Sequence, residues 1–106
     1  RHVSTLSFKD LLVAAKKMMK EDARFALVLP FYESRLFIKE AESLGFYLQK
    51  EFLISPIEGK EPNRVNMQFV LNEVESVETV LFTIRNKDYS YTDEYKEFLK
   101  EFYLDF

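Results

Sequence analysis

The feature that most constrains the fold is the stretch Arg24–Tyr32 (RFALVLPFY), the one run apolar enough to lie inside a sheet covered on both faces. Pro30 ends this strand, because proline cannot donate a hydrogen bond to a neighbouring strand and biases the residue before it to extended geometry. An amphipathic helical pattern precedes the strand Phe25–Leu29 and another follows it. This alternation predicts an α/β domain with Phe25–Leu29 as its central strand.

Three amphipathic patterns predict helices that pack on this sheet. The first begins at its N-cap Ser7, the second runs from Glu33 to Leu44 and ends at Gly45, and the third is capped by Thr92. The apolar residues expected to be buried are Phe8, Leu11, Leu12, Ala15, Met18 and Met19 in the first helix, Leu36, Phe37, Ala41 and Leu44 in the second, and Tyr95, Phe98, Leu99, Phe102 and Tyr103 in the third.

Three further segments predict strands. Arg64–Val74 alternates cleanly between apolar and polar residues, which indicates an antiparallel partner for the preceding strand, near an edge of the sheet. That preceding strand is Phe46–Ile54, and the loop Ser55–Asn63 separates the two; Val77–Ile84 is the last strand. The residues expected to share one face of the long strand are Phe46, Leu48, Phe52 and Ile54.

The composition limits what the chain can be. Its 106 residues, 47% apolar and 31% charged, predict one globular unit, residues 1–106. The absence of cysteine excludes a disulfide framework and fits a reducing cytosol, and no apolar run approaches the ~20 residues of a membrane helix. A net charge of −3 argues against a chain-wide electrostatic grip on nucleic acid. Because the chain begins with Arg1 and not with methionine, we expect a fragment of a longer protein.

No set of residues predicts catalysis. The chain contains no glycine-rich nucleotide loop, no P-loop and no nucleophile motif, and its carboxylates lie mainly on helix sides expected to face solvent. The one histidine, His2, has no evident partner for metal binding or proton transfer. We therefore predict no catalytic, cofactor-binding or metal-binding residue in these residues.

Two places are candidates for ligand contact. Pro30 and Phe31 lie at the carboxyl end of the predicted central strand, where α/β sheets place their ligands; the alternative is that they only end the strand and pack under the next helix. Lys60, Asn63 and Arg64 lie at the long loop and could hold a phosphate, because arginine binds phosphate bidentately and lysine binds it as a point charge. The alternative is that these charges contribute only to solubility.

Four residue strings together resemble one enzyme family. They are RHVSTLSFKDLL, RFALVLPFYE, GKEPNRVNMQFV and the terminal IRNKDYSYTDEYKEFLKEFYLDF. The last is the most specific, with Ile84-Arg85 followed by Tyr-Thr-x-Glu-Tyr at Tyr91–Tyr95 and Phe-Tyr-Leu-x-Phe at Phe102–Phe106. Over essentially the whole chain, these strings resemble the bacterial tRNA (adenine-N6)-methyltransferases that modify valine tRNA, which are class I S-adenosylmethionine-dependent enzymes.

The resemblance implies the C-terminal half of a Rossmann-like methyltransferase, with helices flanking a mixed sheet whose antiparallel last strand is inserted beside its neighbour. It implies that S-adenosyl-L-methionine binds the absent N-terminal half, which carries the family's glycine-rich loop and Asn-Pro-Pro-aromatic motif. The complete enzyme is expected to act in the cytoplasm on the N6 amino group of an anticodon-loop adenosine in tRNA, and this fragment alone is expected to be inactive. The residues that transfer as supporting substrate-binding candidates are Pro30, Phe31, Lys60, Asn63 and Arg64.

Two alternatives stay open from the sequence. One is a non-enzymatic α/β interaction module, and the other is a methyltransferase that acts on a different substrate. If a missing half normally covers the central strand, the fragment presents an unpaired apolar edge, which is a template for pairing with another chain. We therefore expect the fragment to form a homodimer or a higher oligomer through that edge.

Overall fold

The computed structural model describes residues 7–102. Three helices and four strands form an α/β unit, which confirms the predicted fold class. The predictions for His2 and Tyr103 fall outside the described residues. In chain order the elements are α1 (Phe8–Met18), β1 (Phe25–Pro30), α2 (Phe31–Ser43), β2 (Tyr47–Ile57), β3 (Arg64–Val70), β4 (Glu78–Arg85) and α3 (Asp93–Phe102).

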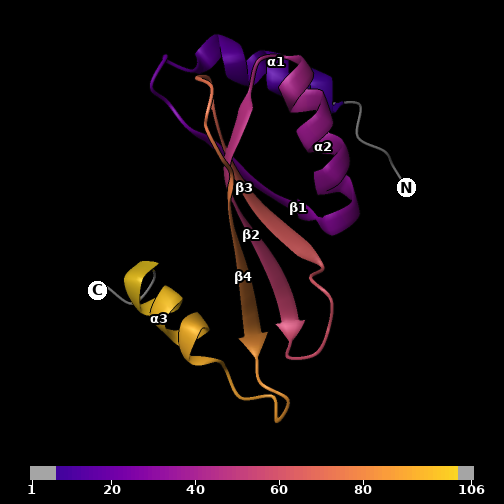
Figure 1. The fold of residues 1–106 in the computed structure, drawn as a ribbon, viewed down its shortest axis with the longest axis vertical. Coiled ribbons are helices and arrows are strands. Elements are labelled where there is room, and N and C mark those ends of the chain that lie inside the picture. Colours follow the sequence, from indigo (N-terminus) through magenta and orange to yellow (C-terminus); the bar gives the residue numbers. More distant parts are fainter. Residues whose placement is uncertain (1–6, 103–106) are drawn as a thin grey trace.

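The strands form one mixed sheet in the order β1-β3-β2-β4. Strand β3 lies between β1 and β2 and is antiparallel to both, whereas β4 is parallel to β2. Figure 1 shows α1 and α2 on one side of this sheet and α3 on the other. The mixed sheet with an inserted antiparallel strand agrees with the arrangement that the resemblance implied.

Strand β3 corrects one prediction about position in the sheet. Arg64–Val74 was expected near an edge, but the strand ends at Val70 and lies in the interior. Its apolar side is fully buried against the helices, while its polar side, which includes Asn66 and Gln68, remains half-buried. A strand of two-sided character fits the centre of this sheet because α1 and α2 cover only one of its faces.

Strand β1 corrects a second prediction. It was expected at the centre of the sheet and buried on both faces, but it pairs only with β3 among the described strands and alternates between half-buried and exposed residues. Phe25, Leu27 and Leu29 pack against the core, whereas Val28 on the other face is 50% exposed. In the described part of the chain, β1 is therefore an edge strand with one covered face.

Strand β2 changes the face that it presents to the core along its length. The register with β3 shifts between Leu48 and Lys50, which marks a β-bulge at Gln49. Residues opposite one another in a ladder share a face, so the bulge places Leu48 opposite the buried Phe69 on the α1–α2 side. The same shift turns Phe52 to the α3 side. The prediction that Phe46, Leu48, Phe52 and Ile54 share one face is therefore wrong.

Strand β2 also extends further than predicted. It continues to Ile57, so Ser55 and Pro56 belong to the strand and the hairpin loop begins only at Glu58. Gly59 has a φ of +90° in the turn of this loop. Because a residue with a side chain rarely adopts this conformation, the glycine is what allows the tight reversal into β3.

The main core lies between the sheet and the helices α1 and α2. Aromatic rings dominate it: the Phe37 ring contacts those of Phe8 and Phe69 at centroid distances of 5.0 and 5.6 Å. Such tilted and edge-on pairs contribute beyond the area that they bury. The residues that are buried in this core are Leu12, Phe37, Ala41, Phe46, Leu48, Val65, Met67 and Phe69.

Both helices on this side begin or end as the sequence predicted. The hydroxyl of Ser7 accepts a hydrogen bond of 3.1 Å from the Asp10 amide at the start of α1. Gly45 follows the end of α2 with a φ of +90°, the left-handed conformation that favours glycine after a helix. The Lys16 ammonium donates to the Leu44 carbonyl at 2.8 Å and thereby satisfies one of the last carbonyls of α2.

Two apolar residues predicted to be buried are exposed. The buried side of α2 follows Ser34, Phe37 and Ala41, so Leu36 falls outside it and is 45% exposed, while Ile38 packs against the core. Met18, the last residue of α1, is 84% exposed, whereas the following Met19 packs against the core.

Helix α3 forms a second, smaller contact layer. Thr92 caps it as predicted, accepting from the Tyr95 amide at 3.1 Å. The Phe82 ring of β4 meets the rings of Tyr95 and Phe98 at centroid distances of 6.2 and 5.5 Å. These contacts dock α3 on the sheet face opposite to α1 and α2 (Figure 1).

Candidate functional site at the end of β1

Four of the five candidate residues meet at one corner of the sheet, where β1 ends and β3 begins. Pro30 lies opposite Arg64 in the β1–β3 ladder. The Phe31 amide donates to the Asn63 carbonyl at 3.0 Å, so the first residue of α2 is tied to the end of the hairpin loop. The structure therefore brings together two segments that the sequence treated as separate candidates.

Lys60 is the candidate that does not join this corner. It lies in the turn of the hairpin loop, where its amide donates to the Ile57 carbonyl at 3.0 Å. Its side chain is exposed and has no hydrogen bond or ion pair with another described residue. Glu58 and Glu61 lie in the same loop, which leaves no concentrated positive charge at the turn.

The side chains of the corner residues point to opposite faces of the sheet. Arg64 precedes the buried Val65, so by alternation it faces the α3 side together with Pro30. The Phe31 ring instead lies beneath the guanidinium of Arg35, whose Cζ is 4.9 Å from the ring centroid. Phe31 is 37% exposed, which makes it a partly open aromatic ring at the rim of the sheet.

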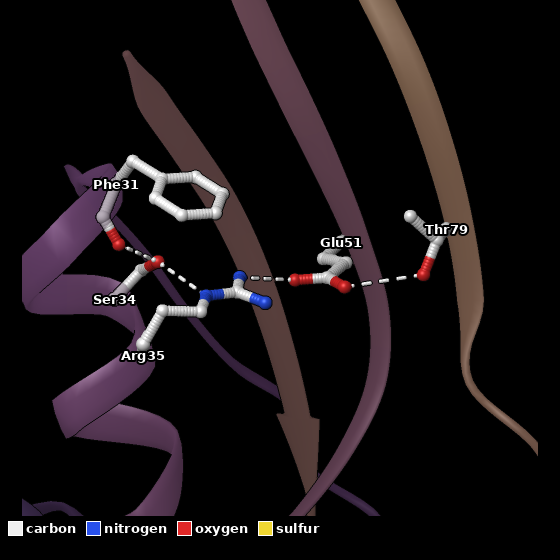
Figure 2. A network of polar contacts seen from close by, with 5 residues as sticks. All are labelled: Phe31, Ser34, Arg35, Glu51 and Thr79. Carbon is white, nitrogen blue, oxygen red and sulfur yellow. Dashed lines mark hydrogen bonds and ion pairs between the residues drawn. The ribbon is translucent and has the colours of Figure 1, made fainter. Parts of the chain in front are cut away.

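Behind Phe31, a chain of polar contacts crosses from α2 to the far strand of the sheet (Figure 2). The Ser34 hydroxyl donates to the Phe31 carbonyl at 2.6 Å, and Arg35 Nε donates to Ser34 Oγ at 3.1 Å. Arg35 Nη2 then forms a 2.6 Å ion pair with Glu51 Oε1 on β2. The other oxygen of Glu51 accepts from the Thr79 hydroxyl on β4 at 3.1 Å.

The burial of Glu51 shows why this network is ordered. Glu51 is only 7% exposed, and a buried carboxylate is costly unless it is paired and hydrogen-bonded. Arg35 and Thr79 supply one partner to each of its two oxygens. The side chain of Arg35 is 37% exposed, so the pair links the interior of the sheet to its surface.

Sequence reasoning missed this network entirely. Glu51 follows Lys50 in a strand where the alternation of apolar and polar residues is interrupted, and only the bulge at Gln49 explains why its carboxylate turns to the α2 side. Arg35 and Ser34 looked like ordinary polar residues of a helix. The interrupted alternation in β2 was the one signal that could have indicated an unusual charged position.

Within residues 7–102, no group of three histidine, aspartate or glutamate side chains gathers as metal ligands. In the same part of the chain, no helix combines the length and apolar composition needed to cross a membrane. The corner presents a partly exposed Phe31, the guanidinium of Arg35 over its ring, and Arg64 on the other face of the sheet.

Curated relatives give an independent view of this chain. A tRNA1(Val) (adenine(37)-N6)-methyltransferase of Trichodesmium erythraeum is 32% identical over 104 residues, which cover 98% of this chain and 43% of that protein. Proteins of the same name are similar in Parabacteroides distasonis (30% identity, 98% of this chain, 44% of the protein) and Dyadobacter fermentans (29% identity, 99% of this chain, 45% of the protein). No family model matches the chain.

These matches agree with the resemblance noted in the residue strings. The chain spans a little under half the length of the relatives that it matches. Over nearly all of its own length, the chain is therefore similar to part of the bacterial tRNA1(Val) (adenine(37)-N6)-methyltransferases.

Proposed function

We propose that this chain forms part of a methyltransferase that transfers a methyl group to the N6 amino group of an adenosine in a tRNA anticodon loop. The observation that carries the proposal is the similarity, at 32% identity over 98% of the chain, to proteins named for this activity. The proposal places the protein in the cytoplasm, with tRNA as its substrate. The sheet supports it, because β3 is inserted antiparallel between β1 and β2 as the family resemblance implied.

The described residues do not fit a site for S-adenosyl-L-methionine. The chain has only two glycines, and both lie in turns that need their conformational freedom: Gly45 after α2 and Gly59 in the hairpin loop. Helix α2 follows β1 directly, with Pro30 as its N-cap and no side-chain cap, so no glycine-rich loop offers its amides to a ligand there. We propose that the methyl donor binds residues of the complete enzyme outside this chain.

In this proposal, the contribution of the chain is to hold RNA. Phe31 offers an aromatic surface at the rim of the sheet, and unpaired bases are commonly recognised by stacking on such rings. Arg64 is exposed at the same rim, opposite Pro30 in the ladder and on the other face of the sheet, where it can bind a phosphate bidentately. Asn63 and Pro30 set the backbone positions of these two side chains. Methyl transfer to a weakly nucleophilic amine depends strongly on such positioning.

The direct test uses the full-length protein, unmodified tRNA and methyl-labelled S-adenosyl-L-methionine. We expect label in the tRNA, at the N6 position of an anticodon-loop adenosine. Arg64→Gln should raise the KM for tRNA several-fold, whereas Arg24→Gln, at the opposite end of β1, should leave it unchanged. If the protein binds tRNA but no label is incorporated, the proposal fails and a non-enzymatic interaction module is favoured.

We also propose that the chain, when isolated, self-associates through the outer edge of β1. That edge has no strand partner among the described residues, and Phe25–Leu29 contains no charge that would oppose pairing. The outer edge of β4 is different: the Thr83 amide donates to the Glu94 carboxylate at 2.9 Å, and the Ile84 carbonyl accepts from the Thr92 amide at 2.9 Å. These hydrogen bonds cover the outer edge of β4 at its carboxyl end, whereas the outer edge of β1 has no such partner among the described residues.

Light scattering on the 106-residue chain tests this proposal. We expect a dimer or larger species that Val28→Lys converts to monomer, because a charge on an edge strand opposes pairing with another chain. Val13→Lys on α1 is the matched control, since this valine is also exposed but lies away from the edge. A monomeric wild-type chain at high concentration contradicts the proposal.

A further inference from the structure

The guanidinium of Arg35 lies over the ring of Phe31. Arg35 Cζ lies 4.9 Å from the ring centroid, a distance at which a cation is attracted to the face of an aromatic ring. Phe31 as a whole remains 37% exposed, so the pair lies at the surface. Figure 2 shows the two side chains close together at the start of α2.

Ser34 and Glu51 hold the guanidinium of Arg35 in place. Its Nη2 is paired with Glu51 at 2.6 Å and its Nε is bonded to Ser34 at 3.1 Å, so two of its three nitrogens are engaged. Glu51 is itself held by Thr79 on β4. This arrangement fixes the plane of the guanidinium, which a single ion pair on a flexible side chain would not do.

We propose that Arg35 is a positioning residue that holds the Phe31 ring as a platform on which an unpaired nucleobase of the RNA stacks. This inference rests on the proposed function, because it names the chemistry by which the same corner binds its substrate. Glu51 and Thr79 belong to the platform by fixing Arg35, and they do not touch the base.

The chemistry of the corner favours a nucleobase as the occupant. An aromatic ring backed by a guanidinium presents a flat surface, and stacking on such a surface accepts any base. Arg64, exposed at the same rim but on the other face of the sheet, adds a positive charge for the phosphate backbone that passes the rim. Within the network, Arg35 balances the charge of Glu51, the one acidic side chain that takes part in it.

The test uses the full-length protein and an anticodon stem–loop RNA that carries 2-aminopurine at one loop position at a time. The fluorescence of 2-aminopurine falls when it stacks, so we expect quenching at one loop position with the wild-type protein. Phe31→Leu should abolish that quenching and weaken binding about tenfold, the range measured for loss of one base–aromatic stack. Phe31→Tyr, which keeps an aromatic ring, should retain both the quenching and the affinity of the wild-type protein.

Arg35→Lys tests the positioning role itself. Lysine keeps the charge and can still pair with Glu51, but it lacks the planar group that covers the ring. We expect partial loss of quenching and about two- to fivefold weaker binding, with the larger change in the KM for tRNA and little change in kcat. Arg24→Lys and Tyr32→Leu are matched controls, since both are exposed and neither contacts the network.

The outcomes separate this inference from the proposed function. If the wild-type protein neither binds nor methylates tRNA, the proposed function fails. If it does both, but Phe31→Leu quenches 2-aminopurine as the wild type does, the platform is refuted. If Phe31→Leu loses quenching while Arg35→Lys behaves like Arg24→Lys, the positioning role is refuted. Thermal unfolding of every variant identifies any change that results from lost folding.

Discussion

Removing Arg35 alone from its ion pair with Glu51 should destabilise the protein more than removing both partners together. Arg35→Met removes a 2.6 Å charge-assisted hydrogen bond and leaves Glu51, which is 7% exposed, with Thr79 as its one partner. A hydrogen bond to a charged group contributes about 1.5–3 kcal/mol. Because the Arg35 side chain is 37% exposed and therefore partly screened, we expect the lower part of this range, about 2 kcal/mol.

The other variants complete the cycle. Glu51→Leu should cost about 1 kcal/mol, since Arg35 reaches solvent and can be hydrated once its partner is gone. The double variant should also cost only about 1 kcal/mol, because apolar replacement of a buried pair is often nearly neutral. The coupling between the two sites is then about 2 kcal/mol, which is within the range seen for residues in one network.

Equilibrium urea unfolding measures this coupling through the transition midpoints, provided that the slope m stays constant. The matched control is the pair Lys50–Glu78, whose 3.7 Å separation and side-chain exposures of 35% and 64% predict a coupling below about 0.5 kcal/mol. If the Arg35 and Glu51 variants prove additive, or if their coupling matches that of the control pair, the network does not hold the guanidinium in place.

Three further changes test local features. Gly45→Ala should cost about 2 kcal/mol by urea unfolding, because the residue has a φ of +90° and an added Cβ lies 2.6 Å from Lys16 Nζ; Lys16→Met, which loses only the hydrogen bond, should cost about half as much. Thr92→Ala should cost about 1–2 kcal/mol through loss of the α3 cap, whereas Thr92→Ser should not; equal effects contradict this. Ser90 hydrogen bonds lower the pKa of Asp88, so Ser90→Ala should raise it in an NMR titration. The contribution of these bonds to stability is present at neutral pH and is lost on acidification.

The helices and most of the strand positions could be predicted because they depend on local signals. Ser7, Gly45 and Thr92 mark helix ends through hydrogen bonds and backbone conformations that involve near neighbours in the sequence. The alternation in Arg64–Val70 likewise showed a strand with one apolar face. These features need no knowledge of the rest of the fold.

The order of the strands depended on information that periodicity does not carry. The apolar run Phe25–Leu29 suits a buried strand, yet the described chain places it at an edge with Val28 half exposed. The alternating strand β3 looked like an edge strand and proved to be interior, because α1 and α2 cover one face of the sheet only. Burial in a sheet is set by what packs on each face, which a single strand does not reveal.

The candidate site was predicted in part. Pro30, Phe31, Asn63 and Arg64 were proposed from two unrelated signals, and the β1–β3 ladder joins them. The network behind Phe31 was not predicted, because the bulge at Gln49 decides which face Glu51 occupies. A one-residue shift in a strand exchanges its two faces, and no local propensity predicted where it would occur.

Nucleoside mass spectrometry of valine tRNA, from cells with and without the gene that encodes this protein, tests the proposed function most directly. We expect N6-methyladenosine in the anticodon loop when the gene is present, and its loss when the gene is deleted. A plasmid carrying the full-length gene should restore the modification. Equal amounts of N6-methyladenosine in both strains would contradict the proposal that this chain is part of a tRNA adenine methyltransferase.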